Sequence, residues 1–291
     1  MSIVNAKEIM VEAAKGKYAI GAFNVTDLVQ LQGVVDAAVE LKSPVIIQTS
    51  VKPSKFLGAD VLVSIYRTVA STAPVPICLH LDHCTDVAYC KRCADAGYTN
   101  IMIDASKQEY AGNISQTREV VEHCHRAGDI SVEGELGTVG GVEDQIKVAE
   151  DEAQLANPEQ AVNFVEATGV DIFAPAIGTA HGVYKTKNPK IDFERLGTIN
   201  KLLNGGGVKT PLVVHGGTGL PADYIKKLIE MGGAKFNVST ELKHTLIDAT
   251  FGYIAANRDE YDPGKVDVAV RDAIRKAVGH WMQMLGSVGK A

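Results

Sequence analysis

The chain of 291 residues contains no apolar run that approaches the roughly 20 residues of a membrane span. Its first residues lack the basic end and apolar core of a secretory signal peptide. Basic residues are not in excess, since 29 Lys and Arg stand against 35 Asp and Glu and give a net charge of -6. We therefore expect neither a membrane nor a nucleic acid as a partner.

Cysteine is too sparse and too uneven for a disulfide framework. The five cysteines are odd in number and clustered, at Cys78, Cys84, Cys90, Cys93 and Cys124. This usage is typical of a reducing compartment, so we predict a cytoplasmic protein. The pair Cys90 and Cys93 lies on a predicted helix without a second ligand pair, which argues against both a zinc finger and a redox centre.

No segment has the composition of a linker between domains. The apolar fraction of 46% and the charged fraction of 22% are ordinary for a globular enzyme. A chain of this length could hold two domains, yet α/β barrels routinely use about 250 residues as one. We expect a single domain over residues 1–291.

Apolar strand-like runs alternate with amphipathic segments along the whole chain. Strands are predicted at 18–25, 44–50, 75–83, 100–106, 130–137, 170–178, 211–216 and 234–239. Helices are predicted at 27–41, 59–73, 87–96, 114–127, 158–168, 193–203 and 222–231, followed by 241–257 and 266–285. Strands rich in Val, Ile and Leu without strict alternation indicate a parallel sheet covered on both faces. The prediction is an α/β fold, a (β/α)8 TIM barrel with extra C-terminal helices, with a doubly wound open sheet as the alternative.

Three histidines stand at the ends of three separate predicted strands. His83 closes the run 75–83, and His181 and His215 each follow another apolar run. A single histidine in such a place would more often cap a strand. Three imidazoles at the carboxyl ends of barrel strands form the ligand set of an open zinc site. Asp82, beside His83, adds a group that can transfer protons.

A barrel would bring further polar residues to the same opening, because active sites of this fold lie at the carboxyl ends of the strands. The additional residues expected there are Asn24, Ser50, Asp104, Glu135 and Asn237. Acidic groups beside three imidazoles would support the ligands or hold a second cation. Two late loops, 215–219 and 237–240, are rich in glycine and hydroxyl residues at the pair of strands where barrels bind phosphate.

These motifs closely resemble those of the class II, zinc-dependent fructose-bisphosphate and tagatose-bisphosphate aldolases. The resemblance extends from residue 6 to the end of the chain and rests on segments 22–24, 81–83, 102–104, 133–137, 176–185, 215–219 and 237–240. It implies that zinc is bound by His83, His181 and His215. Asp82 would transfer the proton at the aldehyde-derived oxygen. Asp104 and Glu135 would flank the metal as an alternative or supporting site.

The resemblance also implies which residues bind the dihydroxyacetone phosphate half of a substrate. They are Gly182, Gly216, Gly217, Thr218, Asn237, Val238, Ser239 and Thr240, with a monovalent cation, Na+ or K+, assisting. Asn24 and Ser50 would contact the substrate as well, and Lys185 would have at most a phosphate or loop role. A metal can stabilise the charge that cleavage between C3 and C4 leaves, so neither Lys185 nor Lys235 has to form a Schiff base.

The segment 138–158 is polar, contains paired glycines and is long for a compact barrel, which is typical of an active-site lid. Relatives usually carry an acidic pair after the two glycines, and here Val142 replaces the first acid. The remaining acid, Glu143, would take the proton from C3 of dihydroxyacetone phosphate when the lid closes.

The chain departs from the family pattern at 155–158, after the lid segment, and at 51–56, which helps form the aldehyde end of the pocket. We expect a ketose with phosphate at C1 and an anionic group at C6. Fructose 1,6-bisphosphate, the glycolytic substrate that yields glyceraldehyde 3-phosphate, comes first. Tagatose 1,6-bisphosphate and 6-deoxy-6-sulfofructose 1-phosphate stay open. Lys52, Lys55 and Arg271 could hold the anion, with Arg271 reaching from a neighbouring subunit of a homo-oligomer, a dimer or tetramer.

Two other classes of function are weighed against an aldolase. A metal-dependent isomerase or epimerase on a similar barrel would need a second acid-base group across the substrate and would release no three-carbon product. A non-catalytic partner subunit, which accompanies some tagatose-bisphosphate aldolases, need not keep the metal ligands. This chain keeps all three histidines, so the partner subunit ranks last.

Overall fold

The computed structural model describes residues 3–143, 146–148, 153–184, 186 and 188–291. Its centre is a closed parallel barrel with the strand order β1-β11-β10-β8-β5-β4-β3-β2. These strands are β1 (Ile20–Asn24), β2 (Val45–Ser50), β3 (Ile77–Cys84), β4 (Asn100–Ile103), β5 (Ser131–Leu136), β8 (Ile172–Pro175), β10 (Leu212–Val214) and β11 (Gly233–Val238). The predicted (β/α)8 barrel is confirmed.

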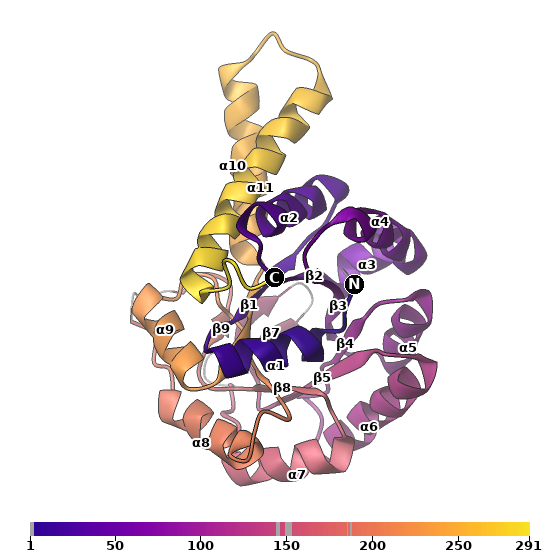
Figure 1. Cartoon of the computed structure of the whole chain (residues 1–291), viewed down its shortest axis with the longest axis vertical. Coiled ribbons are helices and arrows are strands. Elements are labelled where there is room, and N and C mark those ends of the chain that lie inside the picture. The colour runs from indigo at the N-terminus through magenta and orange to yellow at the C-terminus, as the bar shows by residue number, and fades with distance from the viewer. Residues whose placement is uncertain (1–2, 144–145, 149–152, 185, 187) are drawn as a thin grey trace.

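Helices surround the barrel as a ring in Figure 1. They are α2 (Leu28–Leu41), α4 (Ala59–Thr72), α5 (Val87–Ala96), α6 (Tyr110–Ala127), α7 (Pro158–Thr168), α8 (Phe193–Asn204) and α9 (Ala222–Glu230). Several begin at an Asp or Asn whose side chain accepts hydrogen bonds from first-turn amides, as Asp27, Asp86 and Asn157 do. These caps fix where each loop from the carboxyl end of a strand turns into a helix.

The barrel interior is built in layers because every second side chain of a strand points inward. At the N-terminal end, Ile20, Ile46, Cys78 and Val213 pack against the helix α1 (Ala6–Gly16). Sequence reasoning did not predict α1, which closes this end. One step higher the inward positions become polar, and at the carboxyl ends they carry the candidate site. The apolar layer therefore fills the N-terminal end of the barrel, and the inward-facing charged residues lie above it, towards the carboxyl ends of the strands.

A second helix that the sequence did not predict, α3 (Val51–Leu57), follows β2 directly and is followed by α4. It is short and contains Pro53, so a pattern with a period of 3.6 residues cannot develop. The predicted strands 100–106 and 170–178 are also shorter in the structure than expected. Their last residues leave the sheet as loops around the barrel opening, which puts Asp104 beyond the end of β4.

The last two helices, α10 (Thr240–Ala256) and α11 (Pro263–Leu285), form a hairpin that projects beyond the ring (Figure 1). The C-terminal part of α11 lies in the core through Ile274, Val278 and Trp281, and packs against α2. No helix in the described part of the chain is both long and apolar enough to cross a membrane.

Candidate metal centre and active site

β3 presents two neighbouring side chains to the same opening, which a regular strand does not do because its side chains alternate between faces. The register between β3 and β4 shifts between Leu81 and Cys84. Within this irregularity His83 has a φ of 45°, a left-handed conformation that costs a residue with a side chain about 1–2 kcal/mol. The kink lets Asp82 and His83 both be buried in the site. Backbone strain of this kind clusters at functional sites.

Three buried imidazoles meet at this opening. The ring of His83 lies 4.7 Å from that of His181 and 4.5 Å from that of His215, centroid to centroid. Each ring offers a nitrogen within 4.8 Å of the others. His83 Nδ1 is bonded to Asp104 Oδ2 at 2.9 Å and His215 Nε2 to Glu133 Oε1 at 3.0 Å. In His83 and His215, one ring nitrogen is therefore already bonded to a carboxylate.

The other nitrogens of two of these rings, His83 Nε2 and His215 Nδ1, are buried and make no hydrogen bond. His215 Nδ1 does lie 3.0 Å from Glu135 Oε2, but without the direction of a hydrogen bond. Burying such polar atoms without a partner is costly, and a metal ion would satisfy both. The residues present therefore fit a metal, and a donor set of three imidazoles suits zinc among others.

Carboxylates lie beside the rings of His83 and His215, and the charge of His181 is mainly affected by burial and by the other two rings. Burial and the neighbouring imidazoles hold the pKa of His181 well below its usual range, which favours the neutral form that a ligand needs. Asp104 and Glu135 form a second possible metal group with His83. Burial and the charge of Asp104 raise the pKa of Glu135. The structure thus brings together the five residues predicted as metal ligands.

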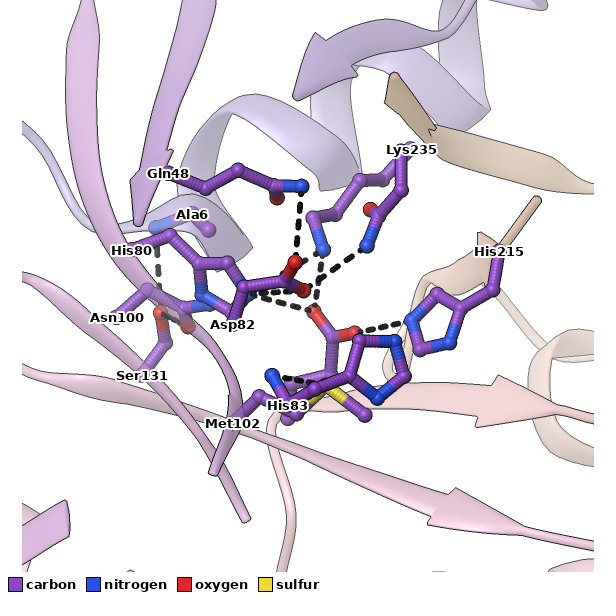
Figure 2. A network of polar contacts seen from close by, with 12 residues as sticks. Ala6, Gln48, His80, Asp82, His83, Asn100, Met102, Ser131, His215 and Lys235 are labelled. Atoms are coloured by element: carbon purple, nitrogen blue, oxygen red, sulfur yellow. Dashed lines mark hydrogen bonds and ion pairs between the residues drawn. The ribbon is translucent and has the colours of Figure 1, made fainter. Parts of the chain in front are cut away.

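Asp82 lies near the carboxyl end of β3 and is fully buried. Its Oδ2 accepts hydrogen bonds from Asn24 Nδ2 at 3.0 Å and Gln48 Nε2 at 3.3 Å, and its Oδ1 accepts one from Asn237 Nδ2 at 3.0 Å. Burial alone would raise the pKa of Asp82, but the positive charge and hydrogen bonds of neighbouring histidines outweigh burial and keep the pKa well below its usual range. Figure 2 shows Asp82 between Gln48 and Lys235, with the ring of His83 nearby.

Backbone of the late loops comes close to the same opening. A Cβ on Gly216, whose φ is 68°, would stand 2.3 Å from the oxygen of Ala180, and one on Gly217 would stand 2.8 Å from that of Asn237. β11 then runs through Ser239 into α10, whose first-turn amides have no partner within the helix. The Oγ of Ser239 is buried without a hydrogen bond. Such a helix start favours an anion.

Comparison with known proteins decides what this arrangement belongs to. Residues 4–290 match the family model described as fructose-bisphosphate aldolase class-II. The chain belongs to the class II fructose-bisphosphate aldolase family. A curated relative, the fructose-bisphosphate aldolase of Geobacillus stearothermophilus, is 40% identical over 300 residues that cover 100% of this chain and 99% of the relative.

Two solved structures share both fold and sequence with this class II aldolase. The YdjI aldolase of Escherichia coli K12 is 32% identical with a TM-score of 0.85, covering 99% of each chain. A candidate fructose-1,6-bisphosphate aldolase of Coccidioides immitis is 31% identical with a TM-score of 0.88, covering 98% of this chain and 97% of its own. The protein is therefore an aldolase, an aldehyde-lyase of a family that is generally metal-dependent.

In this class II aldolase the segment expected to be a plain lid forms part of a small sheet. β6 (Gly140–Glu143) pairs antiparallel with β7 (Ile146–Val148) and parallel with β9 (Ala180–His181), where Gly141 faces His181. A Cβ on Gly141, whose φ is 99°, would stand 2.2 Å from the backbone oxygen of His181. The glycine pair thus anchors the segment beside a candidate metal ligand.

The remaining candidate residues fall in three places. Gly182, with a φ of 90°, directly follows His181, and Ser50 ends β2, where it lies opposite Asp82 in the sheet. Thr218 lies in the loop after β10, Val238 ends β11 and Thr240 begins α10. Glu143 ends β6, and Lys185 lies outside the described residues.

Arg271 is not at the opening of its own chain. It lies on α11, where its Nη2 donates to Asp36 Oδ1 on α2 at 2.8 Å. Together with Thr68 and Pro74 these residues line an outer groove between helices. Lys55 is similarly engaged, with its Nζ 4.0 Å from Asp86 Oδ2 and 4.7 Å from the centre of the Tyr89 ring.

A polar layer beneath the site is formed by Gln48, His80, Asn100, Glu133 and Lys235. Sequence reasoning missed all of these except Lys235, which it considered only as a Schiff-base lysine that the reaction does not require. A signal was present. Glu133 precedes Glu135 by two residues and Lys235 precedes Asn237 by two, so each shares an inward face with a residue that was predicted. His80 stands in the same relation to Asp82. Counting back along each strand in steps of two residues from a predicted site residue leads to these positions.

Proposed function

We propose that this class II aldolase cleaves a ketose 1-phosphate between C3 and C4 with a zinc ion held by His83, His181 and His215. The observation that carries the proposal is the convergence of three buried imidazoles beside a buried carboxylate. The relative named fructose-bisphosphate aldolase supports fructose 1,6-bisphosphate as the leading substrate. The products would be dihydroxyacetone phosphate and glyceraldehyde 3-phosphate.

The position of each group supports a role in this reaction. Zinc would polarise the ketose carbonyl and stabilise the negative charge left by bond cleavage. Asp82 would move the proton at the C4 oxygen, and its bonds to Asn24 and Asn237 would hold the carboxylate in one orientation. Asp104 and Glu135 would support His83 or provide an alternative position for the metal.

The dihydroxyacetone phosphate half would be bound by the late loops. Backbone amides near Gly216 and Gly217 and the first turn of α10 favour a phosphate. The buried, unbonded oxygens of Asn237 and Ser239 favour a polar ligand there, either substrate hydroxyls or a Na+ or K+ ion. The residues proposed for this half are Gly182, Gly216, Gly217, Thr218, Asn237, Val238, Ser239 and Thr240, with Lys185 in a loop role.

Metal dependence is tested first. His83→Ala, His181→Ala and His215→Ala should each lose bound zinc and cleavage together, because an open site with three protein ligands has none to spare. Treatment with a chelator should abolish cleavage and added zinc should restore it. Undiminished turnover after all metal has been removed would disprove the proposal.

Glu143 is proposed to exchange the C3 proton of dihydroxyacetone phosphate. Its place at the end of β6, two residues beyond the partner of His181, supports a role in a hairpin next to the metal. Glu143→Ala should reduce the entry of solvent deuterium into dihydroxyacetone phosphate by about 100-fold or more, while zinc content stays unchanged. Exchange at the wild-type rate would move the role to another base.

The aldehyde end decides between substrates. Lys55 and Arg271 already contact carboxylates of their own chain, so binding a C6 anion would require them to leave these contacts or act across a subunit boundary. Lys52 is exposed on α3. Assays of fructose 1,6-bisphosphate, tagatose 1,6-bisphosphate, 6-deoxy-6-sulfofructose 1-phosphate and fructose 1-phosphate side by side should favour a substrate with an anion at C6. Equal efficiency on fructose 1-phosphate would rule out an anion site there.

We also propose a cytoplasmic homo-oligomer. All five cysteines are buried free thiols, which supports a reducing compartment. The α10–α11 hairpin leaves Ile247, Phe251 and Val268 more than half exposed, at 63%, 74% and 61%. A concentration of exposed apolar side chains on one projecting element is typical of a protein interface. A second copy of the chain is the proposed occupant.

A further inference from the structure

A carboxylate and an ammonium lie beneath the candidate metal ligands, and the proposed mechanism gives neither of them a role. Glu133 and Lys235 are both completely buried. Lys235 Nζ donates to Glu133 Oε2 at 2.9 Å, and the other oxygen of the same carboxylate is 3.0 Å from His215 Nε2. Figure 2 shows this chain of contacts running from Lys235 to His215.

Hydrogen-bond chemistry indicates which of these groups donate and which accept. An ammonium can only donate and an ionised carboxylate can only accept. Glu133 therefore accepts from Lys235 on one oxygen and from His215 Nε2–H on the other. With the hydrogen of the neutral imidazole on Nε2, the lone pair of Nδ1 is available, and Nδ1 is the nitrogen that makes no hydrogen bond.

We propose that Glu133 and Lys235 form a positioning pair that holds His215 as the Nε2–H tautomer and so presents Nδ1 to the metal. This inference rests on the proposed function, because it requires His215 to be a ligand. Partners of this kind fix the ring orientation and raise the basicity of a ligating histidine. The role of Lys235 is to hold the carboxylate in this orientation through its hydrogen bond, not to form an imine with substrate.

The same ammonium also faces the proton-transfer side of the site. Lys235 Nζ lies 3.5 Å from His80 Nε2, which is itself 3.7 Å from Asp82 Oδ1. His80 Nδ1 is in contact with Asn100 Nδ2. Lys235 is thus placed between the carboxylate behind His215 and the carboxylate of Asp82. Loss of its charge should affect both halves of the site.

A matched control exists at the opposite end of the barrel. Asp171 accepts from His125 Nε2 at 2.8 Å and from Lys7 Nζ at 3.0 Å, so it is also a carboxylate between a histidine and a lysine. It precedes β8 and lies near Asn5 and Asp129, away from the three candidate ligands. Asp171→Asn therefore reports the cost of breaking such a cluster without any effect on a metal ligand.

The test uses an amide in place of the carboxylate. In Glu133→Gln the oxygen of the new amide should face Lys235. The NH2 group of this amide then points towards His215 Nε2 and favours the tautomer with hydrogen on Nδ1. Zinc affinity, measured by competition with a chromophoric chelator, should fall about 10- to 100-fold. The visible spectrum of the cobalt-substituted protein should change as well. Asp171→Asn should leave both at the wild-type values.

A double variant distinguishes tautomer control from packing. In Glu133→Gln/Lys235→Met no ammonium competes for the amide oxygen, which can turn to accept from His215 Nε2–H. Zinc affinity should therefore recover towards the wild-type value, although two native groups are gone. The inference would be overturned if the double variant binds zinc no better than Glu133→Gln. It would also be overturned if Glu133→Gln loses no more zinc affinity than Asp171→Asn.

Failure of the proposed function has a different signature. If His215→Ala binds zinc as tightly as the wild type, His215 is not a ligand and the proposed site is wrong. If Glu133→Gln does not fold, the wild-type zinc protein still decides by nuclear magnetic resonance. An exchange-protected ring N–H resonance that is lost in His215→Ala and assigned to Nε2 supports the inference, and assignment to Nδ1 overturns it.

Discussion

Asp82 combines full burial with an environment that favours its charged form. Three side-chain amides, from Asn24, Gln48 and Asn237, donate to its two oxygens. A carboxylate that accepts several hydrogen bonds keeps its proton only at low pH. Its neighbour His83 reaches the same opening through a left-handed backbone. At this scale, strain and hydrogen bonding place a buried carboxylate beside a candidate ligand.

Replacing the Asp82 carboxylate should separate the proposed proton transfer from metal binding. Asp82→Asn keeps the shape of the side chain but removes its capacity to hold a transferable proton. Cleavage should fall about 100- to 10,000-fold, the range for loss of a general acid or base, while zinc content remains at the wild-type level. Metal analysis and steady-state kinetics on the same preparation check this. Loss of zinc together with activity would assign Asp82 a structural role.

At the scale of elements, the small sheet β7-β6-β9 pairs the segment expected to be a lid with the residues that follow β8. Its parallel pairing sets Gly140 opposite Ala180 and Gly141 opposite His181. Because β9 contains a candidate ligand, movement of the segment and the position of His181 are linked through backbone contacts. A glycine is required at 141 both for its positive φ and for the approach of the two strands.

Gly141→Ala should therefore disturb the metal site from a distance. The added Cβ collides with the backbone of His181, and the positive φ alone costs more than about 1 kcal/mol. We expect weaker zinc binding and slower cleavage. Gly206→Ala, where nothing lies within 4 Å of the new Cβ, should change neither. Wild-type zinc affinity in Gly141→Ala would show that β6 and β9 move independently.

The α10–α11 hairpin should set the oligomeric state. Ile247 is 63% exposed on α10, and Leu202 is 52% exposed on α8 at the far side of the barrel in Figure 1. Ile247→Asp should convert the proposed oligomer to a smaller species, because a charge would be buried in an apolar interface. Leu202→Asp should leave the mass unchanged. Light scattering after gel filtration measures both, and identical masses would place the interface elsewhere.

At the scale of the whole molecule, the end of the chain returns to its beginning. Ala19 N donates to Leu285 O at 3.0 Å, and Ala291 N donates to Lys42 O at 2.9 Å. A parallel β-bridge also joins Ile3, near the N-terminus, to Ile77 in β3. These contacts support the proposal that residues 1–291 form one domain. Calorimetry should then record a single cooperative unfolding transition.

That transition should move to lower temperature in alkali. Burial raises the pKa of the thiols of Cys78 and Cys124 to about 12 and that of Cys93 to about 11, from 9.0. The unfolded chain loses these protons near pH 9 while the folded protein keeps them, so stability is complete below pH 9 and is lost as pH rises towards 12.

Between pH 7 and pH 10 each such thiol should cost about 1 kcal/mol of unfolding free energy. Cys124→Ala should be less stable than the wild type at pH 7 but lose less stability by pH 10. Thermal unfolding followed at both pH values measures the difference. If Cys124→Ala and the wild type lose the same stability between pH 7 and pH 10, a buried, protonated thiol at this position is contradicted.

Sequence by itself determined the barrel and the catalytic end of it. Apolar runs separated by amphipathic segments give parallel strands and covering helices, since burial on both faces leaves few other solutions. Strand-end histidines then fall on one rim, whatever the details of packing. For that reason His83, His181 and His215 could be predicted to meet, together with Asp82.

Tertiary structure alone decided how these residues are held. The alternation of inward and outward side chains does not reveal that Lys235 and Glu133, about a hundred residues apart, form an ion pair. The two residues lie on β11 and β5, which are not adjacent strands of the closed barrel. The left-handed turn at His83 depends on the register between β3 and β4. The pairing of Arg271 with Asp36 depends on α11 crossing α2. Long-range packing sets such contacts, and no local pattern in the chain encodes them.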